Sequence, residues 1–289
     1  MSSLYKSILA VVIGTLSMAA KPAWTASTTH TASTQASTEQ AAAKRKTLMA
    51  EATSAIAETQ NALKALDNGK SKEALSALER ATGKLEIILA RDPKLTLAPA
   101  GMNVVTQDVQ GGLEAVKQAR KKAEDLIHEG RLQQARLILN DLASETVINV
   151  INIPLATYPT AIKQAVALID QNKTEDAKRV LQDALNTEVI TQTIIPLPLV
   201  SAQDALSTAE KLAEKKQRTA DDNSHLAASL GEARSQLMMA QELGYGVKSD
   251  FDHFYEDIAQ ITRKTSDNKS GKGFFEKIKS SLSELLKSS

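Results

Sequence analysis

The sequence predicts a mainly α-helical protein made of repeated helical hairpins, and three observations support this fold class. Only 12 glycines and 7 prolines occur in 289 residues, while alanine, leucine, lysine and glutamate, which favour helices, are abundant. Aromatic residues make up only 3% of the chain, so the helices must bury an aliphatic core. A pattern typical of a helical hairpin occurs three times. We therefore expect a bundle-like body with short extended segments and a helical appendage at the carboxy terminus.

Each copy of the repeat places Lys or Arg after a Gly or Asn, then Ala five positions and Leu nine positions beyond that Gly or Asn. Gly or Asn closes a helix in the left-handed conformation, and the Ala and Leu lie on one face of the following helix. The unequal spacing of the copies argues against a regular solenoid. The copies run from Leu66 through Gly69, Ala74 and Leu78, from Ile127 through Gly130, Ala135 and Leu139, and from Ile169 through Asn172, Ala177 and Leu181.

Four pairs of helices follow from this pattern and from the remaining apolar periodicity. They are predicted over residues 46–90, 104–145, 160–188 and 200–243. The fourth pair is broken between Arg218 and Ser224, where Asp221 and Ser224 are candidate amino-terminal caps of the next helix.

Each of the first three hairpins is followed by a glutamate, a β-branched stretch and a proline, starting at Glu86, Glu145 and Glu188. Residues 147–153 are apolar on both alternating sets of positions, which is typical of buried extended segments. The prolines at 154, 159, 196 and 198 would interrupt helices there and limit strand pairing. We expect minor extended elements at these Ile-Pro-rich stretches.

The amino terminus has the order of a secretory signal peptide: a charged start, an apolar run at residues 8–16 and then small residues. We expect a signal peptide at 1–26, cleaved between Ala19 and Ala26, although a buried amino-terminal helix is the alternative interpretation. The small polar residues of 27–45 predict a flexible leader. Apolar segments after the leader are too short to span a membrane, so we expect a periplasmic protein.

The body is expected to extend over 46–243, and a different module over 244–289 begins at two glycines that flank a tyrosine. Six of the seven Tyr and Phe residues of the mature chain lie in this module. Its last helix carries an apolar stripe, which we expect to dock on the body; contact with a client protein or a membrane surface is the alternative. The candidate contact residues for a client or partner are Tyr245, Phe251, Phe254, Phe274 and Phe275.

Recognised catalytic patterns are missing from the sequence, so we expect no enzyme, no catalytic residues, no cofactor and no metal site. The chain has no cysteine, and no HExxH, GxSxG or GxGxxG pattern occurs. The pairs Asp221 with His225 and His253 with Asp257 have helical spacing and are interpreted as surface ion pairs or caps. The formal charge of +1 offers no basic field that would attract nucleic acid.

Several stretches resemble the YfdX family of bacterial stress proteins. They are ALKALDNGKSKEALSALERATGKLEIILARDPKLTLAP, GRLQQARLILNDLASETVINVINIPLATYPTAIKQAV, ALNTEVITQTIIPLPLVSAQDAL, LGYGVKSDF and GKGFFEKIK. The resemblance covers about 46–280, and the carboxy-terminal module looks like that of the longer members carried with heat-resistance gene clusters. It implies a periplasmic, mostly helical, self-associating protein that supports survival of heat or acid and is proposed to act as a chaperone.

Two functional hypotheses follow. The first is an ATP-independent holdase that shields the exposed apolar surface of unfolding periplasmic proteins. Because model Asp and Glu pKa values lie near 4, acid would make such a protein strongly cationic and could loosen a self-associated form. The second is a non-catalytic structural or small-molecule-binding protein in which the segments IPLATYP (153–159) and IIPLPLV (194–200) line a groove.

Overall fold

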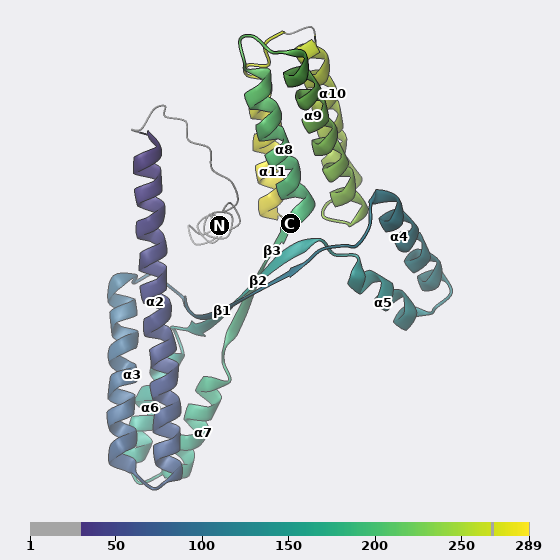
Figure 1. Cartoon of the computed structure of the whole chain (residues 1–289). Coiled ribbons are helices and arrows are strands. Elements are labelled where there is room, and N and C mark those ends of the chain that lie inside the picture. The colour runs from purple at the N-terminus through teal and green to yellow at the C-terminus, as the bar shows by residue number, and fades with distance from the viewer. Residues whose placement is uncertain (1–29, 267–268, 289) are drawn as a thin grey trace. The chain divides into compact units, whose positions relative to one another are not determined.

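The computed structural model describes residues 30–266 and 269–288, with side chains for 43–266 and 269–287. The expected signal peptide at 1–26, with its cleavage between 19 and 26, lies outside the described residues. Within them the chain forms ten helices and three strands (Figure 1). The prediction of a mainly α-helical fold with short strands is confirmed.

The helices carry most of the chain, and the three strands form one small antiparallel sheet in the order β1-β2-β3. The helices are α2 (His30–Asp67), α3 (Ser71–Arg91), α4 (Leu113–His128), α5 (Leu132–Asp141), α6 (Tyr158–Asp170), α7 (Thr174–Leu185), α8 (Leu197–Ala213), α9 (Ala220–Glu242), α10 (Lys248–Thr265) and α11 (Glu276–Ser288). The strands are β1 (Leu97–Gln107), β2 (Glu145–Pro154) and β3 (Val189–Pro196).

The chain divides into two compact units whose boundaries fall inside the three strands. Unit 1 combines Met1–Asn103 with Asn149–Thr191, and unit 2 combines Val104–Ile148 with Gln192–Ser289. This division differs from the expected body at 46–243 and separate module at 244–289. Contacts between distant segments decide the units, and such contacts leave no change in local composition.

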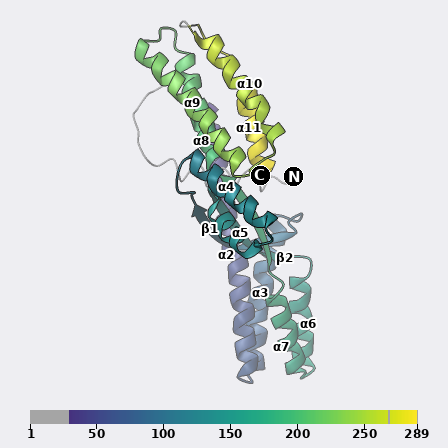
Figure 2. The same ribbon diagram turned by 90° about the vertical axis from the view of Figure 1, so that its right-hand side faces the viewer.

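Unit 1 is a four-helix arrangement in which the hairpin α2–α3 packs against the hairpin α6–α7 (Figures 1 and 2). Helix α2 contacts α7, and α3 contacts α6. The core between them is aliphatic and rich in alanine, which permits close approach of the helices. It includes Leu66 and Leu78 of the first copy of the repeat together with Ile169 and Leu181 of the third copy.

The three predicted hairpins are confirmed at the level of the backbone. Gly69, Gly130 and Asn172 have φ values of 69°, 74° and 59°, in the left-handed region that closes a helix. In each copy the N–H of the following Lys or Arg donates to a carbonyl five residues earlier, at 2.8 Å. This is the Schellman type of helix end, and it turns the chain into the next helix.

Two glycines of the first hairpin should respond in opposite directions to the same substitution. Gly69→Ala places a side chain in the left-handed region and should lower the free energy of unfolding by about 1 kcal/mol. Gly83→Ala replaces a glycine inside α3, where an added Cβ meets open space, and should raise it by about 0.5–1 kcal/mol. Urea unfolding followed by circular dichroism compares the two, and equal effects would contradict the left-handed closure.

Unit 2 contains a four-helix bundle, α8 to α11, and the hairpin α4–α5, whose helix α4 packs on α9. The bundle core joins aliphatic residues of α8 and α9 with residues of α10 and α11. Phe275, Ile278, Leu282 and Leu286 from the last segment are all buried in it. The expectation that the terminal helix docks on the protein's own body is confirmed.

Three local expectations need correction. Residues 30–45 were expected to form a flexible leader, but α2 already begins at His30, since this stretch has no glycine or proline and its alanines favour a helix. Residues 104–107 belong to β1 instead of a helix. The stretch after Glu86 continues α3 to Arg91, and Ile88 lies on the buried face of that helix while Ile87 is exposed.

The cap of α9 is Thr219, in place of the predicted Asp221 or Ser224. The Thr219 hydroxyl accepts the backbone N–H of Asp222, and the Asp222 carboxylate accepts the N–H of Thr219 at 3.0 Å. This capping box satisfies two donors that the start of a helix otherwise leaves free. The sequence pattern Thr-x-x-Asp was the available signal, and the two later polar residues obscured it.

Asp222 should make the stability of the bundle depend on pH. A hydrogen bond from Lys215 at 2.5 Å, helped by the N–H of Thr219, lowers the pKa of Asp222 from 3.8 to about 2. A carboxylate with a lowered pKa in the folded state stabilises above its unfolded pKa, and this stability is lost as the pH falls through about 2. Asp222→Asn should therefore reduce stability at pH 7, and the difference from the wild type should disappear near pH 2. Urea titrations at stepped pH measure the difference in the free energy of unfolding between the two proteins. A difference that is constant with pH would show that the Asp222 carboxylate does not make stability depend on pH.

Candidate interaction surface

The structure separates the five residues that the sequence suggested as contacts for a client or partner. Phe251, Phe254 and Phe275 are fully buried in the core of the unit 2 bundle. Tyr245 is half-buried against that core, and Phe274 is 39% exposed. For the three buried rings the expectation of a contact surface is wrong in the folded bundle, because they supply the largest side chains of an otherwise aliphatic core. Only Phe274 offers an exposed ring.

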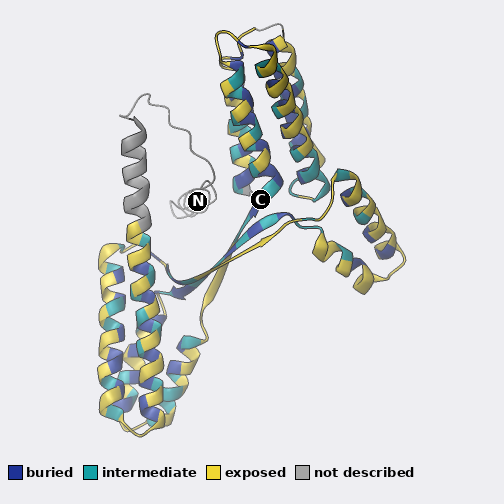
Figure 3. Ribbon diagram, viewed as in Figure 1, coloured by how far each residue is buried: buried dark blue, intermediate teal, exposed yellow. Residues whose placement is uncertain are grey.

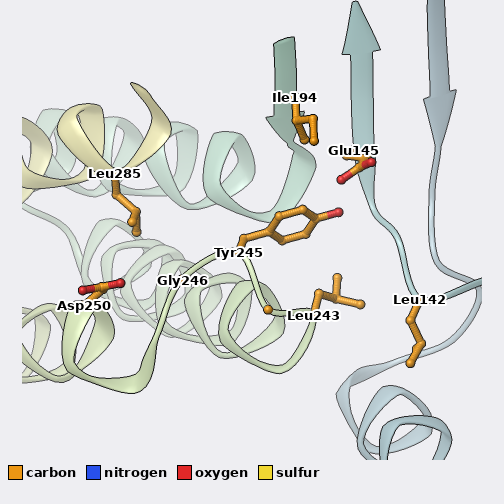
Figure 4. A pocket seen from close by; sticks show the side chains of 9 residues that line it. Leu142, Glu145, Ile194, Leu243, Tyr245, Gly246, Asp250 and Leu285 are labelled. Carbon is orange, nitrogen blue, oxygen red and sulfur yellow. The ribbon is translucent and has the colours of Figure 1, made fainter. Parts of the chain in front are cut away.

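Tyr245 lies at a cavity of about 460 Å³ in unit 2, where its ring points towards Glu145 (Figure 4). Its hydroxyl accepts the backbone N–H of Ser144 at 2.9 Å, and the Ser144 hydroxyl donates to Asp108 at 2.6 Å. Burial raises the pKa of the Tyr245 phenol, and the nearby Glu145 carboxylate adds to the rise. These hydrogen bonds anchor the start of β2 to the turn after α9, so the tyrosine has a structural role.

The largest exposed apolar residues of unit 2's helices gather on the hairpin α4–α5, which is mostly exposed (Figure 3). The hairpin buries only four residues: Val116, Ala123, Leu126 and Ala135. The exposed apolar residues are Ile127, Leu132, Leu137 and Leu139. A ten-residue helix with one buried side chain gains little from its own packing, because helices this short are marginal alone. The sequence pattern had not indicated a contact role for this hairpin.

Comparison of the three copies of the repeat divides these four residues into two sets. Ile127 and Leu139 occupy positions that are apolar in every copy; we call these two residues the pairing face. Leu132 and Leu137 occupy positions that are polar in the other copies; we call these two residues the outer leucines. The positions equivalent to the outer leucines hold Ser71 and Ser76 in the first copy and Thr174 and Arg179 in the third.

The outer leucines are the unusual feature of the second copy. Leu132 is 59% exposed and Leu137 is 64% exposed. Single exposed apolar residues are common on protein surfaces, but here they replace hydroxyl or charged side chains within one repeat. They could have been found in the sequence by aligning the three copies at every position instead of at the shared positions only.

The two segments proposed to line a groove are parts of the cores. Ile153, Leu155 and Tyr158 of the first segment are buried in unit 1. Ile195 and Leu199 of the second are buried in unit 2. Proline ends β2 and β3 and then begins the next helix, so these segments connect strands to helices. The expected groove is therefore not formed by these five side chains.

The histidine pairs form no site in the described part of the chain. His225 and Asp221 lie 3.6 Å apart and are both well exposed, as expected for a surface ion pair. His253 stacks on Phe254, with ring centroids 4.0 Å apart, while Asp257 binds Lys277 at 3.0 Å. No group of three or more His, Asp or Glu side chains among the described residues could hold a metal ion. No described helix is long and apolar enough to cross a membrane.

The chain is a helical-hairpin protein. Left-handed Gly or Asn residues close its hairpins, and a small antiparallel sheet connects them. Within that class, residues 55–194 match a family model described as YfdX protein, so this part of the chain is of the YfdX type. The sequence resemblance is confirmed over that range, which ends inside β3. A solved structure of Salmonella Typhi YfdX is 16% identical, covers 51% of this chain and 91% of that chain, and has a TM-score of 0.36. No curated protein matches the chain.

Proposed function

We propose that the protein is an ATP-independent holdase that binds unfolding proteins in the periplasm through the outer leucines of the hairpin α4–α5. The observation that carries the proposal is the exposure of Leu132 and Leu137 at positions where the other two hairpins have polar residues. An apolar side chain in place of a polar one on a solvated face lowers the solubility of the protein and adds no packing to its core. Binding of apolar segments of other proteins gives this arrangement a use.

The polar surroundings of the outer leucines support the proposal. Gln133, Gln134 and Arg136 are exposed beside them, so apolar contacts alternate with hydrogen-bond donors on one short helix. Such a mixture binds unfolded chains of varied sequence and keeps the free protein soluble. The periplasmic location follows from the expected signal peptide, and survival of heat or acid from the family resemblance.

The expected affinity of a single hairpin is low. Complete burial of a leucine contributes about 1.5–3 kcal/mol, so the two outer leucines supply at most about 6 kcal/mol before the costs of association. This corresponds to a dissociation constant weaker than about 40 μM. Effective protection of a client therefore requires several hairpins that act together.

Light scattering of a heat- or acid-destabilised periplasmic enzyme tests the proposal. The mature wild-type protein should reduce aggregation when several chains are present per client, and the double variant Leu132→Ser/Leu137→Ser should lose most of this effect. The control is Ile190→Ser/Val247→Ser, which removes two apolar side chains that are 66% and 65% exposed outside the hairpin. This control should keep the suppression.

Two results would refute the proposal. One is a wild-type protein that does not reduce aggregation of a client at any pH. The other is an outer-leucine variant that suppresses aggregation as well as the wild type. Point variants are needed because truncation after Leu243 would remove Phe251, Phe254 and Phe275 from the bundle core.

A further inference from the structure

We infer that the pairing face of the hairpin α4–α5, Ile127 with Leu139, is the contact between two copies of this chain. The two hairpins would pack face to face, as the first and third hairpins do inside unit 1. The inference does not depend on the holdase activity, because it concerns the protein without a client.

Burial at the repeated positions is the first step. The residue three positions before the closing Gly or Asn is Leu66, Ile127 or Ile169, and its exposure is 3%, 44% and 4% in the three copies. The leucine nine positions after the closing Gly or Asn is fully buried in the first and third copies, but Leu139, the leucine of the second copy, is 46% exposed. The second copy thus presents to solvent the same two apolar positions that the other copies bury.

The second step is the identity of the partner that buries these positions in unit 1. Leu66, Leu78, Ile169 and Leu181 belong to one core cluster. They meet because α2 contacts α7 and α3 contacts α6, so each hairpin is covered by the other. Within this chain the usual partner of the repeated face is therefore another copy of the repeat.

The third step is the number of copies. The first and third copies pair with each other, which leaves the pairing face of the second copy exposed. A second chain offers an identical hairpin, and a two-fold axis brings each pairing face onto its equivalent. The outer leucines are not expected to form this contact, since the residues at their positions in the other copies are polar and lie outside the core.

The size of the hairpin sets the expected strength of the contact. Helix α4 has 16 residues and a length of about 24 Å, α5 has 10 residues and a length of about 15 Å, and each presents a face about 10 Å wide. This gives about 400 Å² on each copy, half of the roughly 800 Å² per partner of a standard interface. We therefore expect a concentration-dependent dimer that forms in the micromolar range.

Sedimentation velocity of the mature protein from low to high micromolar concentration tests the inference. The wild type should shift from monomer to dimer, and Ile127→Ser/Leu139→Ser should weaken dimerisation at least tenfold. Val247→Ser is the control, since it changes an apolar side chain that is 65% exposed outside the hairpin and should leave the dissociation constant unchanged. Circular dichroism should show equal helix content, because the substituted side chains are exposed.

A distance measurement locates the contact independently of these variants. The chain has no cysteine, so Arg136→Cys on the exposed surface of α5 accepts a single spin label. Dipolar spectroscopy should find the two labels of a dimer within about two or three helix diameters of each other. A monomer at every concentration, a dimer unaffected by Ile127→Ser/Leu139→Ser, or labels too far apart to interact would overturn the inference.

Discussion

Replacement of Arg218 by methionine should lower the stability of the unit 2 bundle by about 3 kcal/mol or more. Arg218 is only 6% exposed, and the four acceptors of its guanidinium are neutral oxygens. It donates to the side chain of Asn223 at 2.8 Å and to the carbonyl of Ala213 at 2.9 Å. It also donates to the carbonyls of Thr265 and Lys269. Methionine keeps the bulk of the side chain but removes these four hydrogen bonds; the Ala213 carbonyl keeps one from the backbone N–H of Gly271 at 3.0 Å.

The position of Arg218 explains why the charge is tolerated in the interior. Ala213 and Thr265 are the last residues of α8 and α10, whose carboxy-terminal ends carry partial negative charge. The same corner is sterically tight, since a Cβ added to Gly271 would lie 2.5 Å from the Cβ of Ala213. Arg218 thus ties the loop after α8 to the segment between α10 and α11.

Urea unfolding, with hydrogen exchange of the amides of α8 to α11, measures the Arg218→Met effect. Arg263→Met removes an exposed guanidinium from the same bundle and should change stability by less than about 0.5 kcal/mol. Arg218→Lys keeps the charge but lacks the planar guanidinium, and its free energy of unfolding should lie between those of the two methionine variants. Equal stability of Arg218→Met and Arg263→Met would show that the buried hydrogen bonds do not stabilise the bundle.

Phe251→Ala should destabilise the same bundle by about 3–5 kcal/mol, because it empties the space of a fully buried ring. The Phe251 ring lies 6.4 Å from that of Phe254, between centroids, and a Cβ added to Gly246 would come within 2.9 Å of it. The surrounding chain is therefore closely packed and cannot collapse without cost.

Phe274→Ala provides the comparison, since it removes a ring that is partly exposed and should cost about 1 kcal/mol or less. Thermal unfolding followed by circular dichroism gives both values. If Phe251→Ala is as stable as Phe274→Ala, the aromatic residues of the terminal segment are not core residues. Aggregation assays of the two variants then show whether either ring contacts clients.

The hairpins were predictable from the sequence because their closure is local. A Gly or Asn that adopts a left-handed conformation needs only its neighbours, so Gly69, Gly130 and Asn172 mark the turns directly. The pairing of hairpins depends on residues about 100 positions apart. Leu78 and Leu139 look identical in the sequence, and only the folded chain shows that one is buried and the other exposed.

The same reasoning applies to the aromatic residues and to the candidate site. Phe251 and Phe254 lie three residues apart on one helical face, a spacing that suits a docked helix and a contact surface equally well. Arg218 had no sequence signal as a buried residue, since its acceptors are mostly carbonyls. The outer leucines could be identified from the sequence, because the equivalent positions of the other two copies hold Ser, Thr or Arg.

The discontinuous composition of unit 1 has a consequence for the order of folding. Its core closes only when α6 and α7 meet α2 and α3, across an intervening segment that passes through unit 2. The bundle α8 to α11 is contiguous in sequence, so its contacts have shorter loops to close and should form faster. A chain that emerges from its amino terminus therefore exposes the apolar face of α2–α3 until about a hundred further residues have followed. During that interval the nascent protein has the same exposed surface as an unfolding protein that a holdase would protect.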